Sequence, residues 1–381
     1  MVFKAKPLFL VFILKKFMAS TIRFSRAESK EFIRTLNKRV NSYFKENKID
    51  KTGNWKLHLK TIIMFSLFFI PYLIILFTPF SPWIKLLMAV LMGVGMAGVG
   101  MNIMHDGNHG TYSKKKWVNK LMGGSIYILA GNVYNWQVQH NVLHHTYTNV
   151  HGHDEDISVG QIVRFTPEAK WRKFHKFQHI YSFFLYGLLT INWAITTDFR
   201  QSKKYLKQKL SYGKLPNPFK QWSTVAISKL IYILLWIITP IVFTELTWWM
   251  VLIGFIAMHF TAGLILSVVF QLAHVTENTI MPIPDEELKF EHAWVTHQLF
   301  TTANFSVHNK FVSWFTGGLN QQVEHHIFPN ISHIHYGKIR KIVKETAQEF
   351  NLPYFEYKST RAAIISHYRF LKELGSQPQL A

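Results

Sequence analysis

Residues 86–109 read LLMAVLMGVGMAGVGMNIMHDGNH, an apolar run that leads directly into two histidines. The part from Leu86 to Met104 carries no charge and is long enough to cross the hydrocarbon core of a bilayer as a helix. His105 and His109 follow at a spacing of four residues, which places both on one face of a continuing helix. Small residues would let a neighbouring membrane helix approach the run closely: Gly93, Ala97, Gly98 and Gly100.

Three further apolar segments have the length of a membrane span. The first covers about residues 61–80 and is separated from the quoted helix by a turn that contains Pro79 and Pro82. The others cover residues 225–244 and 246–270, and Lys229 in the third span is expected to extend towards the membrane surface. The sequence therefore predicts an all-α integral membrane protein, with four transmembrane helices in two hairpins (about 61–80, 86–104, 225–244 and 246–270).

The distribution of basic residues predicts how these spans are oriented. The connections within both hairpins lack Lys and Arg, whereas the segments outside the hairpins are basic. By the positive-inside rule, the N-terminus, the C-terminus and the histidine-rich segments are predicted to be cytoplasmic. Two other apolar runs, residues 121–134 and 180–197, are interpreted as interfacial or re-entrant helices. A lone crossing by the second run would put the later histidines on the opposite side of the membrane from the earlier ones.

The composition limits the kinds of site and partner that are possible. The 381 residues include 20 His and no Cys, and the formal net charge is +22. Without cysteine, disulfides, thiolate zinc sites and protein-ligated iron–sulfur clusters are excluded, so a metal would need nitrogen and oxygen ligands. Nucleic acid, a common partner of basic proteins, is not expected, because lysines that flank membrane spans are explained by topology.

The chain divides into three predicted parts. Residues 1–55 form a basic N-terminal cytosolic or interfacial segment, in which residues 1–17 are interpreted as an extension before a natural start at Met18, and residues 26–50 as a soluble helix on the membrane surface. Residues 56–350 form the membrane domain, with interfacial helices and a cytosolic helical cap that carries a di-metal site. Residues 339–350 are predicted to form an amphipathic helix, and residues 351–381 a cytosolic tail that is frayed from Ser376.

Histidines gather where the predicted spans meet the cytoplasm. If the segment 136–145 is α-helical, His140 and His144 share a face and His145 is turned by roughly 100°. Eight imidazoles suit two metal ions better than one, and the nearby acids are too few for a carboxylate-rich di-metal site. Imidazole binds iron, copper, zinc and nickel, so ligand type alone does not name the metal. The predicted ligands are His105, His109, His140, His144, His145, His274, His325 and His326.

Other polar residues near the clusters are candidates for a supporting role. Four carboxylates are expected to accept an imidazole N–H and so fix its tautomer: Asp106, Asp154, Asp156 and Glu324. The alternative is that they are solvated acids or helix caps. Further candidates are Gln322, His297, His151, His153, His333 and His335. His259 is interpreted as a hydrogen-bonded packing residue inside the fourth span. The histidines expected at the surface or interface are His58, His175, His179, His292, His308 and His367.

Three of these motifs resemble the histidine boxes of membrane fatty acid desaturases in order, spacing and position relative to two transmembrane hairpins. They are His105-Asp-Gly-Asn-His109, His140-Asn-Val-Leu-His144-His145 and Gln322-Val-Glu-His325-His326. The likeness covers roughly residues 55–350. Gln322 at the head of the third box is similar to the front-end or acyl-CoA delta-6 branch, which includes linoleoyl-CoA desaturases.

The resemblance implies a mushroom-shaped, four-span fold with a cytosolic cap and a non-haem centre of two Fe ions held by the box histidines. His274 matches an additional ligand between boxes two and three. The implied reaction uses O2 to introduce a cis double bond into a long-chain acyl-CoA or acyl-lipid substrate. No His-Pro-Gly-Gly haem motif of a fused cytochrome b5 occurs in the sequence. The electron donor is therefore expected to be a ferredoxin, or a free cytochrome b5 with its reductase.

Two alternatives are open at this point. A hydroxylase or ketolase on the same di-iron scaffold would share the first hydrogen abstraction with a desaturase. A membrane metal transporter, a different class of protein, would need ligands along a path within the bilayer. Of the histidines discussed, only His259 is predicted to lie deep in a span. Clusters at the ends of the spans therefore favour an enzyme over a transporter.

Overall fold

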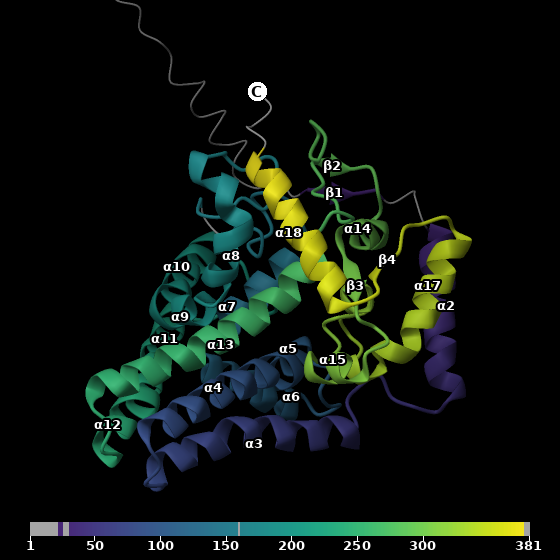
Figure 1. The fold of residues 1–381 in the computed structure, drawn as a ribbon. Helices are drawn as coiled ribbons and strands as arrows, with labels where there is room; N and C mark the ends of the chain where they lie inside the picture. Colours follow the sequence, from purple (N-terminus) through teal and green to yellow (C-terminus); the bar gives the residue numbers. More distant parts are fainter. Residues whose placement is uncertain (1–21, 26–29, 159–160, 377–381) are drawn as a thin grey trace, which may run out of the picture.

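Four long helices form the membrane part of the protein (Figure 1). The structure is a computed structural model and describes residues 22–25, 30–158 and 161–376. In this part of the chain, four helices are long and apolar enough to span a membrane: Trp55–Phe77, Pro82–His109, Pro218–Phe243 and Trp248–His274. The prediction of four spans in two hairpins is confirmed. The interpretation of residues 1–17 as an extension concerns residues outside the described ranges, as do residues 377–381 of the frayed tail.

Polar caps, and not the apolar run alone, set the start of two of these helices. The first residue of α3 (Trp55–Phe77) follows Asn54, whose side chain accepts the backbone N–H of Lys56 at 3.0 Å. The third span begins with α11 (Pro218–Ile233), where Asn217 accepts the N–H of Lys220 at 3.3 Å and Pro218 occupies the first helical position. Both helices therefore extend several residues before the apolar runs that begin at residues 61 and 225.

The second span packs closely against the first and fourth spans at its small residues. It consists of α4 (Pro82–Val99), η1 (Gly100–Met104) and α5 (His105–His109), and it packs on α3 and on α13 (Trp248–His274). A Cβ added at Gly95 would lie 2.6 Å from the backbone nitrogen of Phe68 in α3, and one added at Gly93 would lie 2.7 Å from the Cβ of Thr261 in α13. The close helix approach predicted from the small residues is confirmed.

Replacing Gly95 with alanine is expected to destabilise the protein by about 1–3 kcal/mol, because the new methyl group forces the backbones of α3 and α4 apart. Thermal unfolding of the detergent-solubilised protein would measure the effect. Gly254→Ala in α13 is the matched control, since its added Cβ would meet only the Cβ of Ala89, at an ordinary 3.6 Å. Equal melting temperatures of the two variants would contradict this account of the packing.

A bent helical segment separates the two hairpins. It consists of a first arm up to Tyr186 and a second arm from Leu189, which meet at an angle of 68°. Box two precedes this segment and His274 follows it after one further hairpin. Because these histidines meet in one cluster, described below, the segment does not cross the membrane, as predicted for residues 180–197. Its elements are η4 (Lys173–Phe177), α8 (Gln178–Tyr186), α9 (Leu189–Asn192), η5 (Trp193–Thr197) and α10 (Asp198–Gln208).

The other ambiguous run, residues 121–134, is broken into short pieces and does not form a span. It covers parts of α6 (Lys116–Gly123), η2 (Gly124–Leu129) and α7 (Val133–Trp136). The third span is also interrupted, since η6 (Leu234–Ile238) is a π-helical turn between α11 and α12 (Thr239–Phe243). The Tyr72 hydroxyl of α3 donates a hydrogen bond to the carbonyl of Leu235 in this turn. The turn is thus tied to the first span.

The expectation that Lys229 extends to the membrane surface is wrong. Its ammonium group is buried in an ion pair with Asp198 of α10, with Nζ 2.6 Å from Oδ2. It also donates to the carbonyl of Trp193 at 2.8 Å and to the carbonyl of Ala130. Three acceptors therefore satisfy its three N–H donors. They come from distant parts of the sequence, so the pattern of the span itself could not reveal them.

The cap is built from helices and two small parallel sheets (Figure 1). The helix α2 (Lys30–Glu46) buries Phe32, Leu36 and Val40 against the cap and packs on α17. The apolar face of the helix predicted within residues 26–50 thus covers another helix. The strands are β1 (Arg23–Phe24) with β2 (Lys289–Phe290), and β3 (Ala303–Phe305) with β4 (Phe355–Tyr357). The remaining helices here are α14 (Trp294–Thr301), α15 (Lys310–Phe315), α16 (Gln322–Ile327), η7 (His333–His335) and α17 (Tyr336–Glu349).

The region predicted as a C-terminal tail contains a long helix, α18 (Thr360–Ser376), which packs on α8 and α13. His367 of this helix is buried, with Nε2 2.8 Å from the Tyr186 hydroxyl and Nδ1 2.6 Å from the Val275 carbonyl oxygen. His175 and His179 are also buried. The expectation that they and His367 lie at the surface or interface is wrong, because α18 covers this side of the protein.

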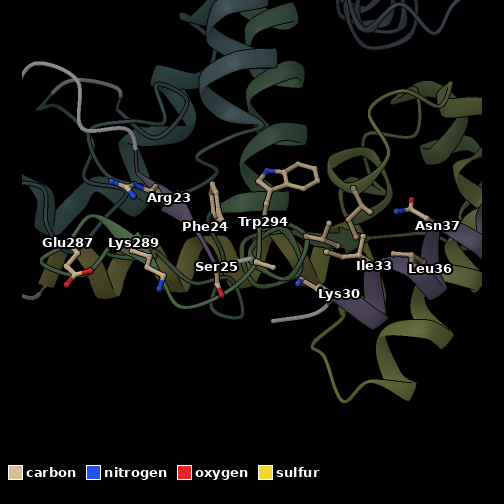
Figure 2. Close-up of a pocket in the computed structure, with 13 residues that line it drawn as sticks. Arg23, Phe24, Ser25, Lys30, Ile33, Leu36, Asn37, Glu287, Lys289 and Trp294 are labelled. Atoms are coloured by element: carbon tan, nitrogen blue, oxygen red, sulfur yellow. The ribbon is translucent and has the colours of Figure 1, made fainter. Parts of the chain in front are cut away.

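A pocket of about 1200 Å³ lies beside β1 and β2 (Figure 2). Its lining includes Phe24, Lys30 and Trp294. The indole N–H of Trp294 donates to the carbonyl of His145 at 2.9 Å, so one wall of this pocket is connected to the histidine cluster.

Candidate metal centre

The first histidine box lies at the end of the second span. There, α5 packs tightly on α6, since a Cβ added at Gly107 would lie 2.8 Å from the carbonyl carbon of Met122. The Asn108 side chain reinforces this contact by donating to the carbonyl of Gly123 at 3.0 Å. The helix ends at Gly110, whose φ of +75° is a left-handed conformation that favours glycine. These contacts hold His105 and His109 at the membrane end of the span.

The second box is π-helical and not α-helical. The element η3 (Gln137–His144) is wider than an α-helix, and the N–H of His145 bonds to the carbonyl of His140, five residues earlier, at 3.0 Å. This brings the Nε2 atoms of His140 and His145 within 3.3 Å. His140 therefore lies close to His145 as well as to His144, whose ring stacks on that of His140. His144 extends towards His274 and His326, so this box contributes to two neighbouring groups.

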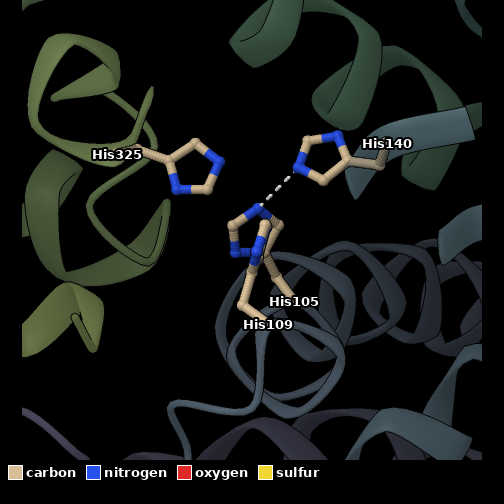
Figure 3. Close-up of side chains that lie close together, drawn as sticks. All are labelled: His105, His109, His140 and His325. Carbon is tan, nitrogen blue, oxygen red and sulfur yellow. Dashed lines mark hydrogen bonds between the residues drawn. The ribbon is translucent and has the colours of Figure 1, made fainter. Parts of the chain in front are cut away.

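The first group consists of His105, His109, His140 and His325, whose ligand atoms all lie within 4.8 Å of one another (Figure 3). Within this group, the Nε2 atoms of His105 and His140 are 3.2 Å apart. His145 lies next to the group, with its Nε2 3.0 Å from that of His325. Two nitrogens bound to the same ion at about 2.0–2.1 Å would be separated by about 2.9–3.4 Å for right-angled to tetrahedral geometry. The observed spacing fits a shared metal ion.

The second group consists of His144, His274 and His326, and its ring nitrogens are arranged in a common way. Each Nδ1 lies against an oxygen acceptor, and each Nε2 is buried without a hydrogen-bond partner among the described residues. This is the arrangement of metal-bound histidines, in which one nitrogen binds the ion and the other donates its hydrogen. The Nδ1 acceptors are Asp154 Oδ2 at 3.0 Å for His144, the Thr301 carbonyl at 3.2 Å for His274 and Gln298 Oε1 at 2.8 Å for His326.

The two groups are adjacent and share residues. A third set of ligand atoms within 4.8 Å joins His145, His325 and His326. His325 therefore belongs to the first group and, through His326, contacts the second. The eight histidines singled out from the sequence all lie in this cluster. Buried nitrogens without partners are costly, and their number here fits a centre that holds two metal ions.

Burial sets the charge of the histidines in the cap side of the cluster. Burial, followed by repulsion from neighbouring imidazoles, lowers the pKa of His140, His145, His325 and His326 well below the usual value. They are therefore neutral, as metal binding requires. Burial also lowers the pKa of His144, but the carboxylates of Asp154 and Asp156 outweigh it and raise this pKa to about 9.

Of the four carboxylates, two lie against a box histidine. Asp154 and Asp156 have oxygens 3.0 and 3.3 Å from His144 Nδ1. Asp154 also accepts backbone N–H groups of Asn149 and Asp156, both at 2.9 Å, which fix its orientation. His144 thus has a carboxylate partner that is held in place, which is the role expected from the sequence for Asp154.

The other two carboxylates have different partners. Asp106 Oδ1 lies 3.0 Å from His333 Nδ1, and the other ring nitrogen of His333, Nε2, lies 2.9 Å from Lys60 Nζ. Asp106 also accepts a hydrogen bond from Ser332 at 2.6 Å. Among the described residues, neither Asp106 nor Glu324 forms a hydrogen bond or an ion pair with one of the eight clustered histidines.

Glu324 is buried among neutral partners. It accepts hydrogen bonds from Asn304 at 2.9 Å and from the Tyr354 hydroxyl at 2.8 Å. Burial raises its pKa to about 7. These bonds hold α16 against the strand β3, so Glu324 fixes the helix that presents box three.

The remaining candidates lie around the cluster and not in it. His297 Nε2 is 2.9 Å from the Thr148 carbonyl, and its ring packs on Phe24 and Phe290. Gln322 is fully buried, and neither atom of its amide has a partner among the described residues. His151 lies 2.9 Å from the Thr166 hydroxyl, His335 lies 3.1 Å from the Thr52 carbonyl, and His153 is exposed.

His259 has the packing role predicted for it. Its Nε2 lies 2.9 Å from the Tyr232 hydroxyl and its Nδ1 lies 2.9 Å from the Thr190 hydroxyl. Both ring nitrogens are therefore occupied inside the membrane part of the protein.

Residues that the sequence did not single out also contact the cluster. Gln298 accepts from His326, and the Tyr336 hydroxyl lies 3.1 Å from His325 Nδ1. Thr148 donates to Gln298 Oε1 at 2.9 Å and thereby orients its amide. These are single polar residues outside the histidine motifs, and no pattern in the sequence distinguishes them.

Replacing Asp154 with asparagine is expected to reduce metal affinity or activity about 10–100-fold, because the neutral amide no longer fixes the His144 tautomer. Metal content after dialysis against a chelator, together with product formation, would measure the effect. Asp50→Asn is the matched control, since Asp50 is exposed and forms a surface ion pair with Lys114. Unchanged metal retention in Asp154→Asn would remove this residue from the centre.

Comparison with known proteins identifies the family. A fatty acid desaturase family model matches residues 81–358. The sn-1 linoleoyl-lipid 6-desaturase of Arthrospira platensis is 35% identical over 95% of this chain and 97% of its own length. That of Synechocystis sp. is 34% identical over 94% and 99%. The acyl-lipid (8-3)-desaturase of Physcomitrium patens is 33% identical over 94% of this chain and 75% of its own length.

These matches and the four spans favour neither the hydroxylase nor the transporter alternative. The relatives act on acyl lipids according to their names, whereas the resemblance of the third box had suggested the acyl-CoA branch as well. The chain belongs to the fatty acid desaturase family, in its front-end branch, and is an integral membrane fatty acid desaturase.

Proposed function

We propose that the histidine centre binds two iron ions and uses O2 to introduce a cis double bond at position 6 of an acyl chain carried by a membrane lipid. The observation that carries this proposal is the meeting of eight imidazoles in two overlapping groups, with ring nitrogens free to bind metal. Imidazole nitrogen is a suitable ligand for iron, and the family match selects iron from the metals that nitrogen ligands allow.

The bound ions would supply the oxidation of an unactivated methylene group, and the protein residues would supply position and environment. The proposed ligands are His105, His109, His140, His144, His145, His274, His325 and His326. Asp154, Gln298 and the Thr301 carbonyl would hold their partner imidazoles in one tautomer. The proposed ligands other than His109 are buried, and this limits the access of water, which would otherwise compete for the oxidising centre.

The substrate proposal rests on the relatives. Two relatives that align over nearly their whole length are named for a linoleoyl chain at the sn-1 position of a lipid and for position 6. We extend this substrate class to the present protein, with linoleoyl lipid as the substrate and acyl-CoA as the alternative carrier. Electrons would come from a ferredoxin or a cytochrome b5 with its reductase, the donors that the resemblance to the desaturase family implies.

The orientation proposal rests on charge. The connections at the end of the bundle opposite the histidines, residues 78–81 and 244–247, carry no Lys or Arg. The positive-inside rule supports a cytoplasmic location for the histidine centre and for both termini.

Expression in a host without polyunsaturated lipids, with linoleate supplied, tests the proposed function. We expect a product that is lighter by two hydrogens, has a new double bond at carbon 6 and occurs in the lipid fraction before the acyl-CoA fraction. The purified protein should contain about two iron atoms per chain. A product that gains an oxygen would show hydroxylation, and a double bond at another carbon would overturn the proposed position.

A further inference from the structure

An apolar pocket lies at the end of the helix bundle farthest from the histidine centre. It has a volume of about 240 Å³ and is formed by α3, α4, the η6–α12 segment and α13, whose ends gather at this end of the bundle (Figure 1). Lys85 lies on α4, 20 residues before His105, which corresponds to about 30 Å of helix. The pocket is therefore separate from the metal centre and, by its position, lies near the opposite membrane surface.

The pocket is open to the surrounding lipid on one side and closed on the other. Trp83, Trp249 and Ile253 line it and are 80%, 45% and 48% exposed, whereas Met92 and Met258 at its inner end are buried. The exposed residues belong to membrane-spanning helices, so the mouth faces the bilayer and not an aqueous channel.

Lys85 is the one charged residue among the described residues that line the pocket. Its side chain is only 8% exposed, although a lysine in the first turn of a span normally extends into the headgroup region. No hydrogen bond or ion pair of its ammonium group occurs in the described part of the chain. Glu245, in the connection nearby, is exposed and not paired with it. Lys85 therefore offers an unpaired cation on the wall of the pocket, to which an anionic group could make a charge-assisted bond.

The other polar groups of the pocket are donors as well. The helices α4 and α13 both begin here, and the side chains of their N-cap residues, Ser81 and Thr247, cap no backbone N–H. The free N–H groups of a helix start attract anions. The hydroxyl of Tyr72 is already used in its bond to Leu235, so it does not neutralise Lys85.

We infer that this pocket binds an anionic phospholipid from the leaflet opposite the histidine centre. Its phosphate pairs with Lys85 and the two helix starts, and part of one acyl chain enters the apolar interior. An apolar cavity that opens sideways to the bilayer fits an acyl chain, and an unpaired cation at its rim fits a charged headgroup. The inference is independent of the metal and of the reaction that the enzyme catalyses.

Lipid retention tests the inference. The purified full chain is stripped of lipid, reconstituted in nanodiscs of phosphatidylcholine with phosphatidylglycerol, and its bound lipid is counted by native mass spectrometry after release. We expect one retained phosphatidylglycerol in preference to phosphatidylcholine. Lys85→Met should reduce its retention at least about tenfold, because a charge-assisted bond to phosphate is lost. Lys85→Arg, which keeps the cation, should retain the lipid.

A second variant tests the cavity without changing the charge. Gly254 lines the pocket and a Cβ there makes only an ordinary contact, so Gly254→Leu should fill the space and also displace the lipid. Lys56→Met removes an exposed lysine at the other end of the bundle and should leave retention unchanged. Wild-type retention in both Lys85→Met and Gly254→Leu, or equal retention of the two lipids, would overturn the inference. If Lys85→Met does not fold, Gly254→Leu and Lys85→Arg decide between these outcomes.

Discussion

Replacing His325 with alanine is expected to reduce desaturation at least about 100-fold. Substitutions of residues that only support a metal ligand already cost about 10–100-fold, and His325 is placed to act as a ligand. It belongs to the group with His105, His109 and His140 and also contacts the set with His145 and His326. Its loss should therefore lower the occupancy of both metal positions, and not only one.

Product formation by reconstituted protein and metal content per chain would measure this effect together. His308→Ala is the matched control, since His308 is an exposed histidine in the cap. His274→Ala, which affects only the second group, should leave more metal bound than His325→Ala. Full activity of His325→Ala would exclude the residue as a ligand, and equal metal loss in the two variants would contradict the shared position of His325.

Replacing Lys229 with methionine is expected to destabilise the protein by about 3–5 kcal/mol, because it leaves the carboxylate of Asp198 buried without its partner. Asp198 also accepts a hydrogen bond from Asn135 at 3.1 Å, and Asn135 lies in α7, which leads into box two. The variant should therefore lose metal as well as stability. Thermal unfolding in detergent, followed by metal analysis, would measure both.

A double variant separates the charge from the packing. Lys229→Met with Asp198→Leu removes both charges and should recover much of the lost stability, since apolar replacement of a buried ion pair is often neutral. Lys220→Met in the same helix is the control, because Lys220 is exposed. If the melting temperature of Lys229→Met equals that of Lys220→Met, the ion pair does not hold the bent segment to the third span.

The membrane fold could be predicted because it depends on composition over short stretches. A run such as residues 86–104 must form a helix in a bilayer, where its backbone groups have no other partners. Gly93 and Gly95 likewise indicated close packing before any neighbour was known. Hydropathy did not give the first residues of two of these helices, because Asn54 and Asn217 cap them several residues before the apolar runs begin.

The fate of single polar residues could not be predicted in the same way. Lys229 has the pattern of a lysine near a membrane surface, but its acceptors come from α10, η5 and residue 130. His367 has the pattern of a surface histidine, but α18 folds back on α8 and buries it. In both residues, contacts between parts of the chain that are far apart in sequence decide the outcome.

The sequence by itself determined the class of the protein, the number of its spans and the eight histidines that meet beyond them, because residue type and spacing act locally. Only the tertiary structure decided how these histidines divide. A π-helical turn moves His145 next to His140 and directs His144 to His274 and His326. It also decided that Asp154 supports His144 whereas Asp106 pairs with His333. The physical reason is that helix phase and carboxylate pairing depend on packing between distant segments, which local spacing does not encode.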